Sequence, residues 1–234
     1  MTKFAPAAAT TEAVDDYLKA ILELSGPADG RVTSNALATH LGVRAASVTG
    51  MLQKLAALET PLVAYEKHRG VHLSPAGRRR ALEVIRHHRL LERFLHDFLD
   101  YSWDEVHEEA ERLEHYISER LEDRIAARLG NPNLDPHGHP IPAKNGAVAQ
   151  RVEIELANWP CEVPAAVSSV SDRDPEALRE MKRLGLVPGA AVVIQPGARA
   201  GSVLVRIGGQ AATRVSPKIA AGVLVQPLVQ GEVR

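Results

Sequence analysis

The 234-residue sequence contains a single cysteine, Cys161, and no long uninterrupted run of apolar residues. One cysteine cannot form a disulfide within the chain, and it excludes a zinc site built from several thiolates. The lack of about 18 consecutive apolar residues excludes a transmembrane helix. The N-terminal stretch also lacks the apolar core of a secretory signal, so we expect a cytoplasmic protein without a membrane partner.

The net charge is also close to zero, at −1, but the basic and acidic residues are segregated along the chain. Residues 31–93 contain 11 basic and 4 acidic residues, whereas residues 94–124 contain 3 basic and 11 acidic ones. A basic block beside an acidic block suggests a module that binds a polyanion joined to one that attracts cations. Two solvated helix faces would explain the charges equally well, so the motifs must decide.

The first third of the chain has the pattern of a winged helix-turn-helix. Apolar residues at helical spacing predict helices over about 12–24, 34–41 and 45–57, and Gly42 supplies the turn between the last two. A β-hairpin follows over 62–73, because short apolar runs flank a polar turn that contains glycine. A hairpin directly after a helix-turn-helix is typical of a wing.

This pattern predicts contacts to double-stranded DNA. Small and polar side chains at the start of the third helix let it approach the bases of the major groove, and basic wing residues suit phosphates. The alternative use of the fold is protein interaction, but the hairpin and the basic block favour DNA. The candidate DNA contacts are Arg44, Ala46, Ser47, Thr49, Gln53, Lys67, His68 and Arg69.

The rest of the chain changes character twice. Helices are expected over about 76–99 and 102–129, and a segment with four prolines, 131–150, is expected to be a linker. From residue 151 on, short Val/Ile/Leu runs alternate with Pro/Gly turns, as in a small antiparallel β barrel with one short helix. The fold class is therefore mainly α with a separate β domain.

Histidines and carboxylates are concentrated on the two predicted long helices. Five of the ten histidines lie between His87 and His115. Spacings of three and four residues place imidazole and carboxylate groups on common helix faces, where several ligands can converge on a divalent metal ion. Surface ion pairing explains single pairs of this kind, but explains three such pairs poorly. The residues concerned are His88, Glu92, His107, Glu111, Glu114 and His115.

The order of these parts resembles the diphtheria toxin repressor family of metal-dependent transcriptional regulators. The resemblance runs from about Thr11 to the C-terminus, and its best stretches are DDYLKAI, SVTGMLQKL, YEKHRGVHLSPAG, HHRLLERFL and VHEEAERLEH. It implies a winged helix-turn-helix over 1–75, a helical dimerisation and metal-binding domain over 76–130, the linker over 131–150, and an SH3-like, FeoA-type domain over 151–234.

The resemblance also implies two metal sites and a homodimer that represses metal-uptake genes when it is loaded with metal. In this reading the acidic helices hold the metal and the chain has no enzymatic activity. The primary site would use Asp16, Glu111, Glu114 and His115. The ancillary site would use His88, Glu92 and His107, and Asp174 and Glu176 are candidates for completing it from the C-terminal domain.

Departures from the family pattern bear on the metal. Iron-responsive members carry Met and Cys where this chain has Asp16 and Glu111, so the expected ligands are all oxygen and nitrogen, which suit Mn²⁺. Fe²⁺ or another divalent transition metal is the alternative. Lys19 stands where short manganese regulators have a second carboxylate, which favours a separate ancillary site over a closely spaced metal pair.

Two other functions fit part of the pattern. A helical carboxylate metalloenzyme would need two Glu-x-x-His motifs, and residues 87–124 contain none. A winged-helix regulator could instead use its histidines to sense pH, since histidine titrates near neutrality.

Overall fold

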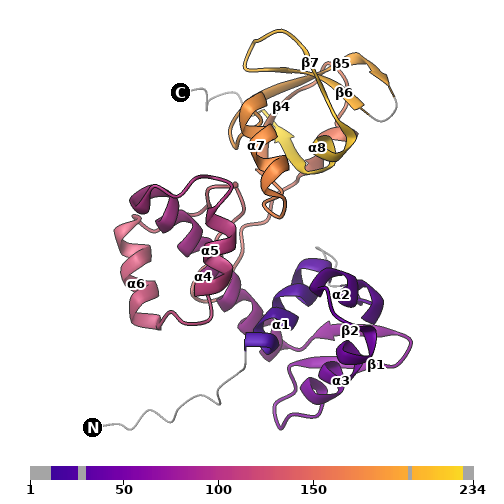
Figure 1. Cartoon of the computed structure of the whole chain (residues 1–234), viewed down its shortest axis with the longest axis vertical. Coiled ribbons are helices and arrows are strands. Elements are labelled where there is room, and N and C mark those ends of the chain that lie inside the picture. Colours follow the sequence, from indigo (N-terminus) through magenta and orange to yellow (C-terminus); the bar gives the residue numbers. More distant parts are fainter. Residues whose placement is uncertain (1–11, 26–29, 200–201, 229–234) are drawn as a thin grey trace. The chain divides into compact units, whose positions relative to one another are not determined.

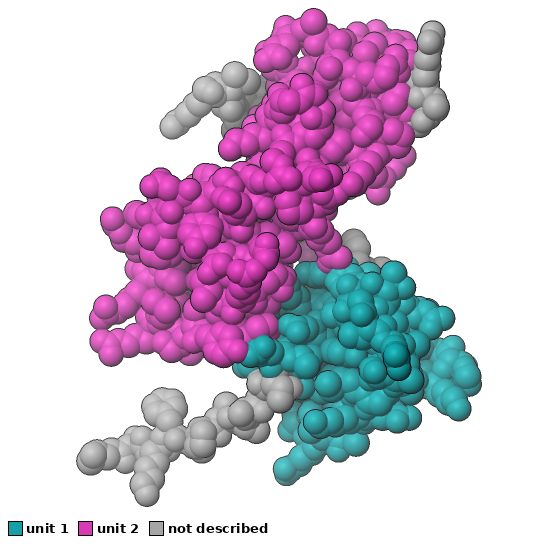
Figure 2. Space-filling model, viewed as in Figure 1, with its two compact units in different colours: residues 1–87, 142–147 teal, residues 88–141, 148–234 magenta. Residues whose placement is uncertain are grey.

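The computed structural model describes residues 12–25, 30–199 and 202–228. These residues form two compact units, one of residues 1–87 and 142–147 and the other of residues 88–141 and 148–234 (Figure 2). Among the described residues, no helix combines the length and the apolar character that a membrane crossing needs.

Unit 1 is a winged helix-turn-helix (Figure 1). Apolar residues from all of its elements, including Leu18, Leu37 and Leu52, are fully buried in one core. A salt bridge between buried Asp15 and Arg80 Nε, 2.9 Å long, ties the first helix to the start of the long fourth helix. Its elements are α1 (Glu12–Ser25), α2 (Ser34–Leu41), α3 (Ala45–Ala56), β1 (Val63–Glu66), β2 (Gly70–Leu73) and the first half of α4 (Pro75–Leu99).

Local sequence explains the turns of unit 1. The Thr33 hydroxyl accepts a hydrogen bond from the Ala36 amide and so caps α2, and Gly42 ends α2 with a φ of 65°. The wing pairs Val63 with Leu73 and Glu66 with Gly70 in antiparallel register. Gly70 has a φ of 92°, and a Cβ there would lie 2.6 Å from the Val32 carbonyl oxygen, so only glycine fits.

The helical part of unit 2 differs from the sequence prediction at one place. The helix expected over 102–129 is two helices, α5 (Val106–Leu113) and α6 (Glu119–Arg128). The break occurs because the Ser118 hydroxyl accepts a hydrogen bond from the Leu121 amide and caps a new helix. Glu114 is consequently the C-cap of α5 rather than a residue in mid-helix.

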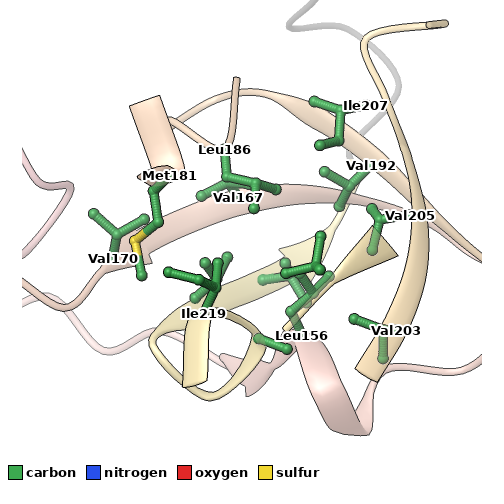
Figure 3. Packing of buried hydrophobic residues seen from close by; sticks show 14 of the residues in the cluster. Leu156, Val167, Val170, Met181, Leu186, Val192, Val203, Val205, Ile207 and Ile219 are labelled. Carbon is green, nitrogen blue, oxygen red and sulfur yellow. The ribbon is translucent and has the colours of Figure 1, made fainter. Parts of the chain in front are cut away.

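The C-terminal part of unit 2 is a six-stranded antiparallel sheet with the strand order β3-β8-β4-β5-β6-β7. Side chains from the sheet and from the helix α7, such as Met181, Leu186, Val167 and Val205, meet in its interior (Figure 3). The strands are β3 (Ile154–Glu155), β4 (Pro164–Val170), β5 (Ala191–Arg199), β6 (Ser202–Ile207), β7 (Thr213–Val215) and β8 (Val223–Pro227), and the short helices are η1 (Leu156–Asn158), α7 (Pro175–Leu184) and α8 (Pro217–Ala221).

The segment expected to be a linker, 131–150, is structured over its first half. Residues 131–141 belong to unit 2, where His137 is fully buried and Ile141 packs in the core of the helical part. Gly138 has a φ of 90°, and a Cβ there would lie 2.2 Å from the Ser168 carbonyl oxygen of β4. The prolines therefore shape a packed loop that joins the helices to the sheet within unit 2.

Candidate metal centre and nucleic-acid interface

A buried cluster of imidazole and carboxylate groups lies in unit 2, around Glu92 of α4. His88 Nε2 is 2.9 Å from Glu92 Oε1 and 3.1 Å from His107 Nδ1, and His107 Nδ1 is 3.2 Å from Glu92 Oε1. Ligands bonded at about 2.1 Å to one octahedral ion lie about 3 Å from their neighbours. The three residues predicted for the ancillary site are thus brought together at a spacing that fits shared coordination.

The C-terminal domain contributes Asp172 to this cluster, directly after β4. Asp172 Oδ2 lies 3.7 Å from His107 Nδ1 and 3.5 Å from Nδ1 of His139. His88, Glu92, His107 and Asp172 form a group that could hold a metal ion.

Asp174 and Glu176, the two residues proposed from the sequence for this role, lie elsewhere. The Asp174 carboxylate caps α7 by accepting hydrogen bonds from the Glu176 and Ala177 amides, 3.0 and 3.2 Å long, and it pairs with Lys218. Glu176 is exposed in the first turn of the same helix. Within the same segment of the chain, Asp172 is the residue that lies beside the cluster.

The proline-rich loop supplies three further groups that the sequence analysis did not select, Asp135, His137 and His139. The Asp135 carboxylate accepts hydrogen bonds from the backbone amides of His137 and His139, 2.8 and 2.9 Å long, which folds the loop. Glu92, Asp135 and His137 form a second group that could hold an ion. The D-P-H-G-H motif was a signal for these residues, but its prolines favoured the interpretation as a linker.

Two atoms of the cluster that could bind a metal ion have no hydrogen-bond partner among the described residues, although both side chains are fully buried. They are Glu92 Oε2 and His137 Nδ1. A buried polar atom without a partner costs about 1–3 kcal/mol. His137 Nε2 donates to the Trp103 carbonyl oxygen, 2.8 Å away, so Nδ1 is the nitrogen that faces the cluster and would offer its lone pair to a bound ion. Both atoms are therefore placed to act as metal ligands.

Electrostatics holds the cluster together. Burial by itself would raise the pKa of the Glu92 carboxyl, but the charge of His88, the hydrogen bond with His107 and the nearby imidazole of His137 hold that pKa well below its ordinary value. Burial lowers the pKa of His137, but the Glu92 carboxylate outweighs it and the pKa rises to about 9. Each charge in this buried site is therefore stabilised by neighbouring charges of opposite sign, in place of the water that would solvate it at the surface.

A second cluster lies at the end of α5. His88 Nδ1 is 2.5 Å from Glu114 Oε2 and 3.8 Å from Glu111 Oε1, and these three residues form another group that could hold an ion. Glu114 Oε1 is 3.7 Å from His115 Nε2. Three of the four residues predicted for the primary site therefore lie together in unit 2, and the fourth, Asp16, lies half-buried on α1 of unit 1.

Cys161 plays no part in these clusters. It is exposed near the start of β4 and belongs to none of the groups of possible ligands among the described residues. Every donor atom in them is a carboxylate oxygen or an imidazole nitrogen.

In unit 1, a cleft of about 390 Å³ separates the helix-turn-helix from the wing. Ala46 and Thr49 of α3 line one side and Lys67 and His68 of the wing line the other, and His68 adopts a positive φ of 67° at the tip of the hairpin. The cleft also contains residues that the sequence analysis did not propose, namely Asn35 and Tyr65 among others.

The remaining predicted DNA contacts lie on the same two elements, α3 and the wing, but do not line the cleft. Arg44 is the exposed N-cap of α3, and Ser47 and Gln53 are exposed on the same helix. Arg69 is highly exposed and pairs with Glu66, at 3.2 Å between Nη1 and Oε2. The Arg31 and Arg69 hydrogen bonds keep the pKa of the Glu66 carboxyl below its ordinary value. The surface thus has the small residues and the exposed cations that suit contacts to a DNA groove and its phosphates.

Comparisons with known proteins agree with this architecture. Residues 9–71 match the family model "Iron dependent repressor, N-terminal DNA binding domain", residues 74–143 match "Iron dependent repressor, metal binding and dimerisation domain", and residues 154–227 match the FeoA domain. The iron-dependent repressor IdeR of Mycobacterium leprae is 34% identical over 172 residues, which are 68% of this chain and 74% of that protein.

Solved structures show the same likeness. A manganese-dependent transcriptional repressor in complex with manganese is 37% identical, with a TM-score of 0.84 over 92% of this chain and 100% of that one. ScaR with bound Zn²⁺ is 29% identical, with a TM-score of 0.77 over 92% of this chain and 99% of that one. The predicted fold class and family are confirmed, and the interpretation as a metal-dependent, DNA-binding repressor holds over that of a metalloenzyme. The chain belongs to the iron-dependent repressor family and is a long member that ends in a FeoA domain.

Proposed function

We propose that the protein is a manganese-responsive repressor that binds operator DNA as a homodimer when its two clusters are loaded with Mn²⁺, and that it represses genes of metal uptake. The observation that carries this proposal is the donor set, which consists of buried and half-buried carboxylates and imidazoles without sulfur. Hard oxygen ligands with imidazole suit Mn²⁺, whereas thiolate and thioether ligands would retain softer metals. The manganese-dependent repressor of similar structure supports the same choice.

Asp16 is central to the proposed mechanism. It lies on α1 of the DNA-binding unit, while Glu111, Glu114 and His115 lie in unit 2. If all four residues share the primary ion, the bound metal favours one spacing of the two recognition helices in a dimer. A two-fold dimer would then match half-sites about 34 Å apart. Metal affinity and DNA affinity rise together by the same coupling free energy.

The ancillary ion would be held by His88, Glu92, His107 and Asp172, with Asp135 and His137 as further ligands or as their supports. The bound ion supplies positive charge where carboxylates from α4 and from the C-terminal domain approach each other. The side chains of the chain itself do the positioning, since Asp135 folds its loop and the Trp103 carbonyl orients His137. Occupancy is thereby linked to the packing of the helical part against the FeoA domain within unit 2.

The proposal can be tested with DNA selected in vitro. A random duplex library is selected on the full chain with 1 mM Mn²⁺, and binding of the enriched duplex is followed by fluorescence anisotropy with Mn²⁺, with Fe²⁺ under anaerobic conditions, and with EDTA. We expect Mn²⁺ to tighten binding at least about tenfold, a coupling of about 1.4 kcal/mol. If the duplex binds as tightly with EDTA as with Mn²⁺ at every pH, the proposed metal dependence is contradicted. If binding with EDTA and with Mn²⁺ is equally tight but changes with pH, the pH-sensing alternative is supported.

The primary-site residues are tested in the same assay. We expect Glu114→Ala and His115→Ala each to abolish the response to Mn²⁺ while light scattering still reports a dimer. The matched control is Glu109→Ala, which removes a carboxylate of the same helix whose partner is Arg112 on the surface. A retained Mn²⁺ response in Glu114→Ala or His115→Ala would refute the assignment of the primary site.

A further inference from the structure

The imidazole of His88 stands between the two clusters and touches both. Its Nε2 faces Glu92 and His107, at 2.9 and 3.1 Å, and its Nδ1 faces Glu114, at 2.5 Å. The ring is almost completely buried, and so are both carboxylates. The His88 ring is therefore held in place on two sides, within hydrogen-bond distance of a carboxylate of each cluster.

A neutral imidazole has one N–H group and one lone pair. If the lone pair of Nε2 is a ligand in the ancillary cluster, the proton must be on Nδ1, which lies 2.5 Å from Glu114 Oε2. Glu114 is then held through Oε2, and its other oxygen, Oε1, is the one that faces His115. One ring thus connects the coordination of one ion to the orientation of a ligand for the other.

We propose that His88 is the positioning residue that couples the two sites: Nε2 belongs to the ancillary ligand set, and Nδ1 donates the hydrogen bond that orients Glu114 in the primary set. The proposal rests on the proposed metal binding. An ion bound through Nε2 excludes a proton from that nitrogen, so the N–H group of the ring is on Nδ1 and faces Glu114. Occupancy of the ancillary site thereby fixes the donor that orients Glu114 and strengthens the primary site.

The test is a titration of the metal-free full chain with Mn²⁺, in which the EPR signal of free Mn²⁺ reports the number of ions bound and their affinities. Three variants separate the two nitrogen atoms. His88→Ala removes both, and His88→Asn keeps an amide donor at the position of Nδ1. His107→Ala, the matched control, removes an ancillary ligand but leaves His88 intact. Thermal unfolding of each metal-free variant verifies the fold.

All three variants are expected to lose the ancillary ion. The remaining site should be weakest in His88→Ala, by about tenfold or more, as for other residues that orient a metal ligand. The Mn²⁺ affinity of this site should be intermediate in His107→Ala and close to that of the wild type in His88→Asn. The proposal is overturned if the primary site of His88→Asn binds Mn²⁺ as weakly as that of His88→Ala. It is also overturned if His88→Ala and His107→Ala bind Mn²⁺ at that site with equal affinity. A wild-type chain that binds no Mn²⁺ at all would instead overturn the proposed function.

Discussion

Unit 1 carries its candidate DNA-binding charges on the surface, whereas the cluster around Glu92 in unit 2 holds most of its charges in the interior. The side chain of Arg69 is 77% exposed, while that of Glu92 is 0% exposed. Exposed charges are screened by water and salt and act almost independently of one another. Buried charges depend on their few partners, so the loss of one leaves the others unbalanced. The two regions should therefore respond very differently to single substitutions.

The largest expected effect is that of Glu92→Gln. This change removes a buried carboxylate that is in contact with His88, His107 and His137 together. Breaking a buried ion pair by removing one partner costs about 3–5 kcal/mol, so we expect the metal-free protein to lose about 3 kcal/mol of its free energy of unfolding in urea. The ancillary ion should be lost as well.

Glu108→Gln provides the comparison for Glu92→Gln. Glu108 is an exposed carboxylate that pairs with Arg112 on the surface of α5. Its loss should change the free energy of unfolding by less than about 1 kcal/mol. Equal effects of the two substitutions would show that burial does not set the difference between the regions.

A smaller effect, which separates metal binding from stability, is expected for Asp172 and Asp174. Asp172→Asn should weaken ancillary Mn²⁺ binding by about 10- to 100-fold, because the aspartate lies among the candidate ligands. Asp174→Ala should leave Mn²⁺ affinity unchanged and cost about 1 kcal/mol of stability, since it removes the cap of α7. Calorimetry measures the Mn²⁺ affinity, and unfolding in urea measures the stability. If Asp174→Ala weakens Mn²⁺ binding and Asp172→Asn does not, Asp174 is the ligand.

The smallest effect is expected on the DNA-binding side. Arg69→Ala should weaken binding to all duplexes similarly and lower the slope of log affinity against log salt by about one unit, as for the loss of one phosphate contact. Arg112→Ala, which removes an equally charged and exposed side chain from unit 2, is the control. A loss confined to one operator position would make Arg69 a base-reading residue.

The local part of the fold was predictable from the sequence. Helix caps and turn residues such as Thr33 and Gly42 act within a few residues, so α2, α3 and the wing lie where the pattern predicts them. The sequence did not predict the break at Ser118, because the apolar periodicity continues across it. A single serine is only a weak sign that one helix ends and another begins.

The candidate metal centre was predictable only in part, for a related reason. His88 and Glu92 are four residues apart on one helix, so their proximity follows from the helical repeat. Asp135, His137 and Asp172 join them from a proline-rich loop and from the end of a strand, and neither spacing nor composition specifies that approach. Their positions depend on how the sheet packs against the loop, as the close contact at Gly138 illustrates.

The sequence by itself determined the chemistry, because the number of cysteines and the supply of carboxylates and histidines are properties of composition. It also determined the helical pairs, because a repeat of 3.6 residues makes neighbours of residues four apart. Only the tertiary structure decided which aspartate of 172–176 lies beside His107, and that both nitrogen atoms of His88 are engaged. Such contacts join segments that are distant in the chain, and long-range packing places them to within an ångström, which no local pattern can do.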